Sequence, residues 1–201
     1  TQTSMALING LYQATIPEFP FHTTVEYQVF AWDNAGNMAS SSVSNYTVTD
    51  PVPPIARIIS PSEGSFLAGT VGITVFMMDQ NSGGESGFAT AELSINDTIV
   101  KTRNTEPTSG ADAIMWDTLT SGGDGNYTIR LIVHDKAGNT AQKTITVTVD
   151  NTMPFAVINQ PTSGSYLRLV TLIKVTGTDT NFDKMEVRID NALIQTFHAQ
   201  G

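Results

Sequence analysis

Acidic side chains are the residues of this chain best suited to chemistry, because carboxylate oxygens are the ligands that calcium and other hard cations prefer. Six of them stand at a chain junction, at the end of an apolar run or in a tight turn: Asp50, Asp150, Asp79, Asp179, Asp33 and Asp135. The sequence contains no Asp-x-Asp-x-Asp-Gly loop, and turn geometry usually explains Asp in hairpins. We therefore expect no cofactor, with calcium as the one ion for which the sequence offers candidate ligands.

Other side chains with metal-binding or nucleophilic chemistry are few. The three His residues, His22, His134 and His198, are far apart and have no metal-ligand spacing. The chain has no Cys and no Gly-x-Ser-x-Gly motif, so the thiolate and the serine nucleophile elbow are both missing. The sequence predicts that this segment is not an enzyme.

Three Asn-x-Thr sequons are candidate acceptors for N-linked glycans: Asn45, Asn96 and Asn126. We expect Asn45 to point outward from a strand, and Asn96 and Asn126 to lie in turns. All three are then accessible in an exported protein, which makes it a candidate glycoprotein.

Two near-identical turns, Asp-x-Ala-Gly-Asn, follow runs in which apolar residues alternate with others, 25–31 and 127–133. A period of two is typical of a half-buried strand. Asp favours a hairpin because its side chain accepts hydrogen bonds from backbone N–H groups. Gly and Asn also favour a hairpin, because both tolerate positive φ. The predicted structural turn residues are Asp33, Gly36, Asn37, Asp135, Gly138 and Asn139.

Seven alternating runs lie between residues 51 and 150, separated by turn sequences. The predicted strands are 55–59, 71–78, 89–95, 98–101, 113–116, 127–134 and 144–149. Seven short strands in about 100 residues predict an all-β fold, an antiparallel Ig-like β-sandwich, without a convincing helix. Its predicted core is Ile58, Ile73, Val75, Leu93, Ile95, Trp116, Ile129, Leu131, Ile145 and Val147.

Pro-bearing segments divide the chain at 50–54 and 150–154. Each predicts an extended linker, because Pro fixes φ and moves the residue before it away from helical conformations. Residues 54–79 match 154–179 at an offset of 100, which indicates tandem repeats. The predicted domains are a C-terminal half-domain at 1–50, a complete domain at 51–150 and an N-terminal half-domain at 151–201.

Three motifs carry a family resemblance: Val149-Asp150-Asn151-Thr152-Met153-Pro154, Ile158-x-x-Pro161-x-x-Gly164-Ser165-Tyr166-Leu167, and Tyr127-x-Ile129-x-Leu131-x-Val133-x-Asp135-x-Ala137-Gly138-Asn139. They resemble the tandem immunoglobulin-like domains of large bacterial and archaeal surface and secreted proteins. The motif Gly10-x-Tyr12-x-Ala14-x-Ile16-Pro17 resembles a fibronectin-type-III-like variant of that group. The resemblance implies architecture more than function, since such modules serve as spacers, stalks, adhesin repeats, surface-layer components and accessory domains of secreted hydrolases.

Charge and hydropathy exclude several partners. The net charge of −9 opposes binding to nucleic acid and to anionic lipid surfaces. No apolar run approaches the roughly 20 residues that span a bilayer, so no membrane insertion is expected within this segment.

The leading hypothesis is a structural segment of an extracellular or cell-surface multidomain protein: a stalk, adhesin, surface-layer or filament component. Its expected partners are neighbouring Ig-like domains. The alternative is a polysaccharide-binding or spacer module of a secreted hydrolase, or one that contacts cell-surface glycans. That alternative requires an exposed row of aromatic side chains, for which the candidates are Tyr12, Phe19, Phe21 and Trp32.

The two half-domains have two explanations: either the chain is a window cut from a longer polypeptide, or copies of the chain complete each other head-to-tail and grow as a filament. In both cases Tyr27, Val29 and Ala31 are expected to pack against strands that the first half does not itself contain.

Overall fold

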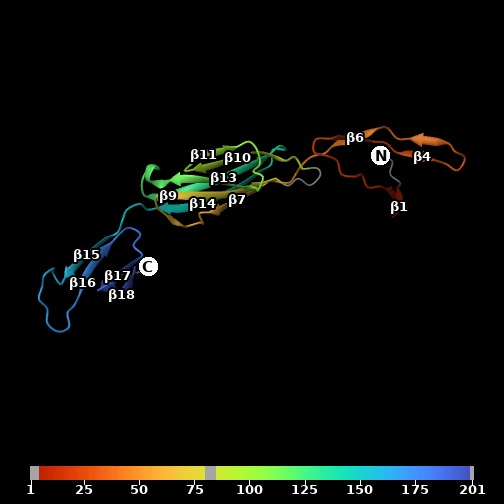
Figure 1. Ribbon diagram of the computed structural model, residues 1–201. Helices are drawn as coiled ribbons and strands as arrows, with labels where there is room; N and C mark the ends of the chain where they lie inside the picture. The colour runs from red at the N-terminus through yellow and green to blue at the C-terminus, as the bar shows by residue number, and fades with distance from the viewer. Residues whose placement is uncertain (1–4, 80–84, 200–201) are drawn as a thin grey trace. The chain divides into compact units, whose positions relative to one another are not determined.

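The computed structural model describes residues 5–79 and 85–199. Their regular structure consists of β-strands and one short 3₁₀ helix, Thr118–Thr120, which confirms the expected all-β fold (Figure 1). The described residues contain no helix long and apolar enough to cross a membrane.

Two sheets build the central segment. One has three strands in the order β12-β9-β7, and the other has five in the order β11-β10-β13-β14-β8. Their bounds are β7 Ile55–Ser60, β8 Phe66–Leu67, β9 Thr70–Met78, β10 Phe88–Ile95, β11 Thr98–Arg103, β12 Ala111–Asp117, β13 Gly125–Asp135 and β14 Thr140–Val149. All seven predicted strands are present, and β14 begins four residues earlier than predicted.

One strand of this segment is missing from the prediction. β8 pairs in parallel with the end of β14, with Phe66 opposite Thr148 and Leu67 opposite Val149. A strand of two residues is too short to show a period, so hydrophobic alternation cannot reveal it.

The core of the central segment consists of side chains that alternate along the long strands. Nine of the ten predicted core residues are buried, and four of them are fully buried: Ile73, Ile129, Leu131 and Val147. Ile58 is the exception, because it is only half-buried on β7, an edge strand of the three-stranded sheet. The core also includes buried residues outside the prediction: Met77, Phe88, Ala91, Tyr127, Val133 and Val149.

Three two-stranded sheets form the segment before residue 50: β1 Ala6–Ile8 with β2 Leu11–Gln13, β3 Thr24–Tyr27 with β6 Ser44–Thr47, and β4 Phe30–Trp32 with β5 Met38–Ser40. The continuous strand predicted before the first turn is wrong, because the chain is interrupted at Gln28 and Val29. Both residues bond to Ser41 instead: Gln28 Nε2 donates to its carbonyl at 2.7 Å, and Val29 N–H donates to its Oγ at 3.1 Å. Tyr27 and Val29 are exposed, and Val25 is the buried apolar residue among those described here.

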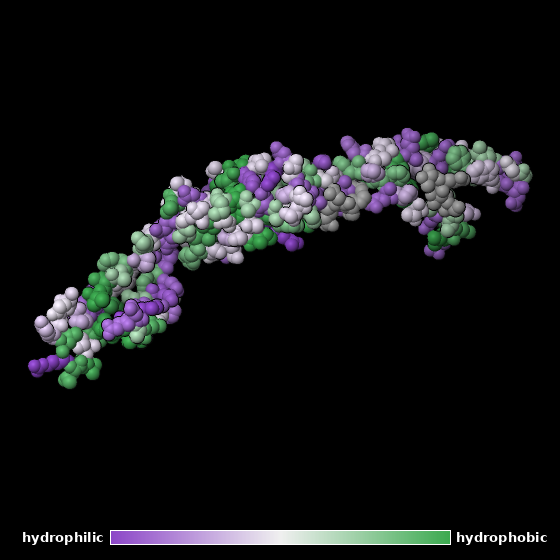
Figure 2. Space-filling model, viewed as in Figure 1, coloured by the Kyte–Doolittle hydropathy of each residue, from purple (hydrophilic) through white to green (hydrophobic). Residues whose placement is uncertain are grey.

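Two further two-stranded sheets follow residue 154: β15 Phe155–Gln160 with β16 Lys174–Thr178, and β17 Lys184–Ile189 with β18 Ala192–His198. Large apolar side chains between β15 and β16 are fully exposed, among them Tyr166, Leu169 and Val170. Figure 2 shows that apolar residues form much of the visible surface of this segment.

The chain divides into two compact units that do not follow the repeat. The first comprises residues up to 65, 72–116 and 127–147, and the second comprises 66–71, 117–126 and the residues from 148 onward. The first unit contains nearly all of the core described above. The repeat boundaries after residues 50 and 150 stay predictions.

Candidate functional site

The turn after β13 is built by Asp135 and Asn139. Asp135 Oδ1 accepts a hydrogen bond from the backbone N–H of Asn139 at 2.7 Å, and Oδ2 accepts one from Asn139 Nδ2 at 2.7 Å. The backbone N–H of Asp135 donates to the carbonyl of Asn139 at 3.1 Å. One carboxylate and one amide thus fix both ends of the turn.

The turn after β4 has the same construction. Asp33 Oδ1 accepts from the backbone N–H of Asn37 at 2.8 Å, and Oδ2 accepts from Asn37 Nδ2 at 2.7 Å. These bonds, the side-chain amide first, lower the pKa of Asp33. The twin sequences therefore encode one side-chain arrangement twice.

Positive φ in these turns is confined to glycine. Gly36 and Gly138 have φ of 89° and 93°, whereas Asn37 and Asn139 do not take positive φ. The expectation for the two Asn residues is wrong because their role is different: the amide is needed as a donor to the Asp carboxylate.

Three of the predicted calcium candidates come together in space. Asp50 lies in the first linker, Asp79 directly follows β9 and Asp135 is the last residue of β13. One carboxylate oxygen from each lies within 4.8 Å of the others. Their relative exposures are only 6%, 2% and 3%, so the three acids form a buried cluster and not a solvated acidic surface.

Hydrogen bonds position Asp50 in this cluster. Its Oδ1 accepts from Val52 N–H at 2.9 Å and its Oδ2 accepts from Ser86 N–H at 2.7 Å. Burial raises the pKa of Asp50, but the bonds from Ser86 and Val52 outweigh burial, and the net pKa is lowered. The amide of Asn139 donates to the carbonyl of Asp50 at 2.8 Å, which attaches the linker to the hairpin.

The segment that carries Ser86 is held beside the same hairpin, because Lys136 N–H donates to the carbonyl of Gly87 at 2.9 Å. Sequence reasoning missed Ser86. It lies outside the repeat match and has no motif, and only its backbone contact with Asp50 identifies it.

The structure does not bring Asp150, Asp179 or Asp33 into a comparable cluster. Asp150 and Asp179 are half-buried, and Asn181 connects them: its Nδ2 donates to Asp150 Oδ2 at 2.7 Å and its N–H donates to Asp179 Oδ1 at 2.8 Å. Asp33 is exposed. The repeat therefore retains two of the positions but not the buried environment.

All three sequon Asn residues are exposed. Asn45 lies in β6 and Asn96 lies in the turn between β10 and β11, as expected. Asn126 is in β13 and not in a turn, because the strand begins one residue earlier, at Gly125. The side-chain oxygens of Asn96 and Asn126 accept hydrogen bonds from Thr128 N–H at 2.8 Å and from Thr148 Oγ1 at 3.0 Å.

None of the three imidazoles belongs to a group of three or more potential metal ligands among the described residues. His134 Nδ1 is 2.9 Å from Thr140 Oγ1 across the hairpin. Trp32, at the equivalent place before the first turn, is exposed and stacks on Phe30 with ring centroids 6.1 Å apart.

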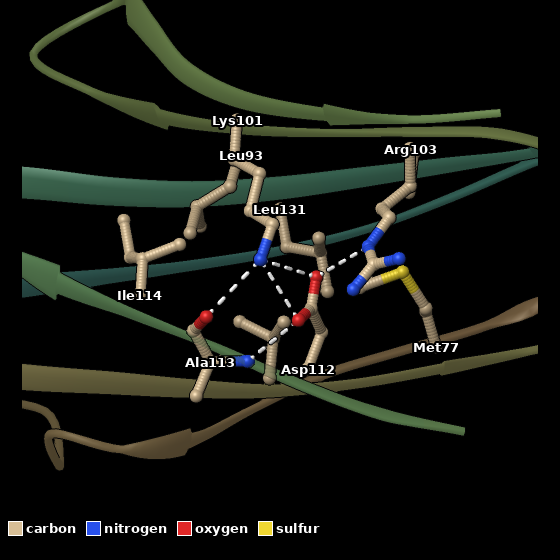
Figure 3. Close-up of a pocket in the computed structure, with 10 residues that line it drawn as sticks. Met77, Leu93, Lys101, Arg103, Asp112, Ala113, Ile114 and Leu131 are labelled. Atoms are coloured by element: carbon tan, nitrogen blue, oxygen red, sulfur yellow. Dashed lines mark hydrogen bonds and ion pairs between the residues drawn. The ribbon is translucent and has the colours of Figure 1, made fainter. Parts of the chain in front are cut away.

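An ion-pair group closes one side of the central sandwich. Asp112 on β12 accepts from Lys101 Nζ at 2.8 Å and from Arg103 Nε at 2.6 Å, both on β11 (Figure 3). β11 and β12 are the edge strands of the two sheets, so these bonds join the sheets. The hydrogen bond from Arg103, followed in effect by the one from Lys101, holds the pKa of Asp112 far below its usual range although burial raises it.

The cavity beside this group has a volume of about 10 Å³ and is lined by Val75, Met77, Ala91, Leu93 and Leu131 among others. That volume is about the minimum for one water molecule. We conclude that the ion pairs are a structural connection and that this cavity does not hold a small-molecule ligand.

No family model matches the chain, and no curated protein matches it. Among solved structures, 31 chains match it. One is an endo-β-1,4-mannanase from Thermotoga petrophila, at 22% identity and a TM-score of 0.40 over 51% of this chain and 21% of that one. Another comprises the fibronectin(III)-like modules of Clostridium thermocellum CbhA, at 13% identity and a TM-score of 0.39 over 69% and 83%.

A third is a Ca²⁺-stabilized adhesin with which an Antarctic bacterium binds ice, at 21% identity and a TM-score of 0.30 over 70% of this chain and 35% of that one. The chain thus spans about a fifth of the mannanase and about a third of the adhesin. Its structural neighbours include fibronectin(III)-like modules and a bacterial adhesin.

Proposed function

We propose that this chain is a structural segment of an extracellular multidomain cell-surface protein, a part of a stalk, adhesin, surface layer or filament. The observation that supports this proposal is the way both Pro-bearing linkers are fastened. A linker that is hydrogen-bonded along its length holds the next module at a set distance, whereas a free Gly- or Ser-rich linker does not.

The first linker is fastened through both its side chains and its backbone. Asn139 Nδ2 donates to the carbonyls of Asp50 and Val52, at 2.8 and 3.4 Å. The carboxylate of Asp50 in turn accepts from the N–H groups of Val52 and Ser86. Pro51, Pro53 and Pro54 also stiffen the linker, because each has a fixed φ and no backbone N–H that would need an acceptor.

The second linker is fastened by different residues to the same effect. Asp150 N–H donates to the carbonyl of Leu67 at 2.9 Å. Asn151 Oδ1 accepts from Gly69 N–H at 2.8 Å and from Thr118 Oγ1 at 3.1 Å. Asp124 accepts from the Thr152 hydroxyl and from Asn151 N–H at 2.7 Å. These bonds, the one from Thr152 first, lower the pKa of Asp124.

In this proposal the partners of the segment are neighbouring Ig-like domains or further copies of the chain, and it catalyses no reaction. The test is made in the cells that produce the protein. An antibody raised against residues 55–149 should label intact cells, and replacement of those residues by an unrelated β-sandwich of equal length should leave surface display and attachment unchanged. Labelling that requires permeabilised cells would contradict the proposal.

A second candidate function, binding of polysaccharide or cell-surface glycans, is favoured by the stacked pair of Phe30 and Trp32. Both rings are exposed, and they stand two residues apart on β4, hence on one face of the strand. Aromatic faces of this kind offer a platform for sugar rings. Of the other predicted members, Phe19 and Phe21 are less suitable because they are half-buried, and Tyr12 is exposed but lies on a different strand, β2.

Binding to a panel of insoluble polysaccharides separates the two candidates. A glycan-binding module should lose retention when Trp32 is replaced by Ala and keep it when exposed Tyr12 is replaced by Ala. No retention of the parent chain on any polysaccharide would leave the spacer function alone in place, and equal retention of the parent chain and both variants would show that Trp32 is not the binding residue.

A further inference from the structure

The cluster of Asp50, Asp79 and Asp135 places three carboxylates where water has little access. Burial of a carboxylate is strongly unfavourable unless its charge is compensated. Neither Asp50 nor Asp135 forms an ion pair with Lys or Arg within residues 5–79 and 85–199. The acidic partners in the ion pairs found there are Asp97, Asp112 and Glu186.

Neutral N–H donors compensate part of the negative charge of Asp50 and Asp135, and they leave some carboxylate lone pairs available for another ligand. Asp50 and Asp135 each accept two N–H hydrogen bonds, one on each oxygen. A carboxylate has about four lone-pair sites, so about two on each group remain. The donors hold these two carboxylates in place without neutralising them.

A fourth oxygen lies at the same place. The Ser86 hydroxyl is buried beside Asp50 and makes no hydrogen bond of full geometric quality among the described residues, although the residue's own N–H donates to Asp50 Oδ2. Its side chain is close enough to Asp50 to contribute to lowering the pKa of that group. A buried hydroxyl without a partner is rare and costly, and a bound cation would use its oxygen.

The spacing of the oxygens fits a calcium ion. Calcium binds oxygen ligands at about 2.3–2.6 Å, so ligands on opposite sides of one ion are up to about 5 Å apart. The carboxylate oxygens of the cluster lie within 4.8 Å of one another. Calcium also accepts irregular arrangements of six to eight oxygens, with water completing the set, which suits three Asp and one Ser from separate segments.

We propose that Asp50, Asp79 and Asp135, with the hydroxyl of Ser86, bind one calcium ion. The ion connects the first linker to the end of β9 and to the end of β13, three segments that are far apart in the sequence. Because this arrangement exists only in the folded chain, binding stabilises the folded state and immobilises the linker.

The repeat supplies a matched control. Asp179 occupies the position of Asp79 one repeat later, but there the amide of Asn181 lies between it and Asp150, and both acids are half-buried. Calcium binding should therefore require Asp79 and should not require Asp179.

The test is calorimetric titration of the chelator-treated 201-residue chain with calcium chloride, combined with thermal unfolding. We expect one ion bound per chain and a melting temperature raised by several degrees in millimolar calcium and returned by chelator. Asp79→Asn and Asp135→Asn should abolish the binding heat and the thermal shift, whereas Asp179→Asn should keep both. Magnesium should give a smaller shift, because it requires a tighter octahedral arrangement.

Ser86→Ala keeps the proposal testable if a carboxylate variant fails to fold. It removes only the hydroxyl and should weaken calcium binding about tenfold, with a melting temperature in chelator equal to or above that of the parent, since an unpartnered buried hydroxyl is removed. Absence of binding heat and thermal shift in the parent chain would overturn the proposal. An unchanged response in both Asp79→Asn and Ser86→Ala would also overturn it, because calcium would then bind elsewhere.

Discussion

At the scale of single residues, burial is the property that the sequence predicts best. Alternation along a strand identifies which side chains face inward, and it correctly places Leu131 and Trp116 in the core. It cannot identify Ser86, because a polar residue in an irregular segment has no period. The same limit applies to the buried carboxylates: turn geometry explains Asp135 in the sequence, and only the fold brings Asp50 and Asp79 beside it.

Leu131 gives a direct measure of the core. It is fully buried in β13, so Leu131→Ala removes apolar contacts and leaves a cavity. We expect the free energy of unfolding to fall by about 2–5 kcal/mol, measured by denaturant titration. Leu119→Ala, at a side chain that is 67% exposed, should change it by less than about 0.5 kcal/mol. A loss below about 1 kcal/mol for Leu131→Ala would contradict the assignment of the inward face.

Asp112 should make stability depend on pH in the acid range. Because its pKa in the folded chain is lowered, chiefly by Arg103, its contribution is complete above the unfolded pKa of about 3.9. The contribution is lost as pH falls toward the lower folded pKa. Asp112→Asn should cost about 1–3 kcal/mol near neutral pH, and the difference from the parent should shrink below about pH 4.

The control for this prediction is Asp97→Asn. Asp97 pairs with Arg130 at 2.9 Å, but its side chain is 84% exposed, so water screens the pair and little stability is at stake. Urea titrations across the acid pH range, made on the parent chain, Asp112→Asn and Asp97→Asn, give the free energy of unfolding of each and test this prediction. A constant gap between the parent and Asp112→Asn at every pH would mean that the ionised form of Asp112 is not what stabilises the sandwich edge.

At the scale of elements, strands are predictable in proportion to their length. The long strands β9, β10 and β13 show a period of two over eight or more residues, and their bounds are predicted closely. β8 has too few residues for any pattern. The split between β3 and β4 is also not predictable, because it depends on bonds from Gln28 and Val29 to Ser41, which is distant in sequence.

The start of β12 depends on a glycine. Gly110 has φ of 70°, its carbonyl accepts from Met77 N–H at 2.7 Å, and a Cβ added to it would lie 2.6 Å from the Phe76 ring. Gly110→Ala should therefore combine backbone strain of about 1 kcal/mol with overpacking of about 1–3 kcal/mol.

Gly123→Ala is the matched variant for strain alone, because Gly123 has φ of 103° and open space where its Cβ would go. The difference between the two variants in the free energy of unfolding, measured by denaturant titration, gives the cost of the contact with Phe76. Equal losses would show that the ring moves aside without cost.

At the scale of the whole molecule, the sequence predicts the all-β class and the position of the central segment, since these follow from pattern and turn chemistry. It does not predict how much of the rest is packed. Residues outside 55–149 form two-stranded sheets with mostly exposed faces, and an isolated two-stranded sheet is at best marginally stable.

Hydrogen exchange should follow this division. Backbone amides of β10, β13 and β14 should exchange slowly, because they lie in a multi-stranded sheet over a buried core. Amides of β3 to β6 and β15 to β18 should exchange faster by at least about a hundredfold. Protection of these strands equal to that of β13, appearing only at high protein concentration, would instead show that copies of the chain cover their apolar faces.

The parallel pairing of β8 with β14 determines how the central segment carries tension. When a chain is stretched, the upstream end of β8 and the downstream end of β14 are pulled in opposite directions along two strands that run the same way. The load then acts as shear, so the bonds between the strands, with those from Gly64 N–H to Thr146 O and from Asp150 N–H to Leu67 O, bear it together. An antiparallel hairpin pulled at its open end would instead release its bonds one after another. We therefore expect the two-residue strand β8 to contribute more to the resistance of the sandwich against stretching than its length suggests.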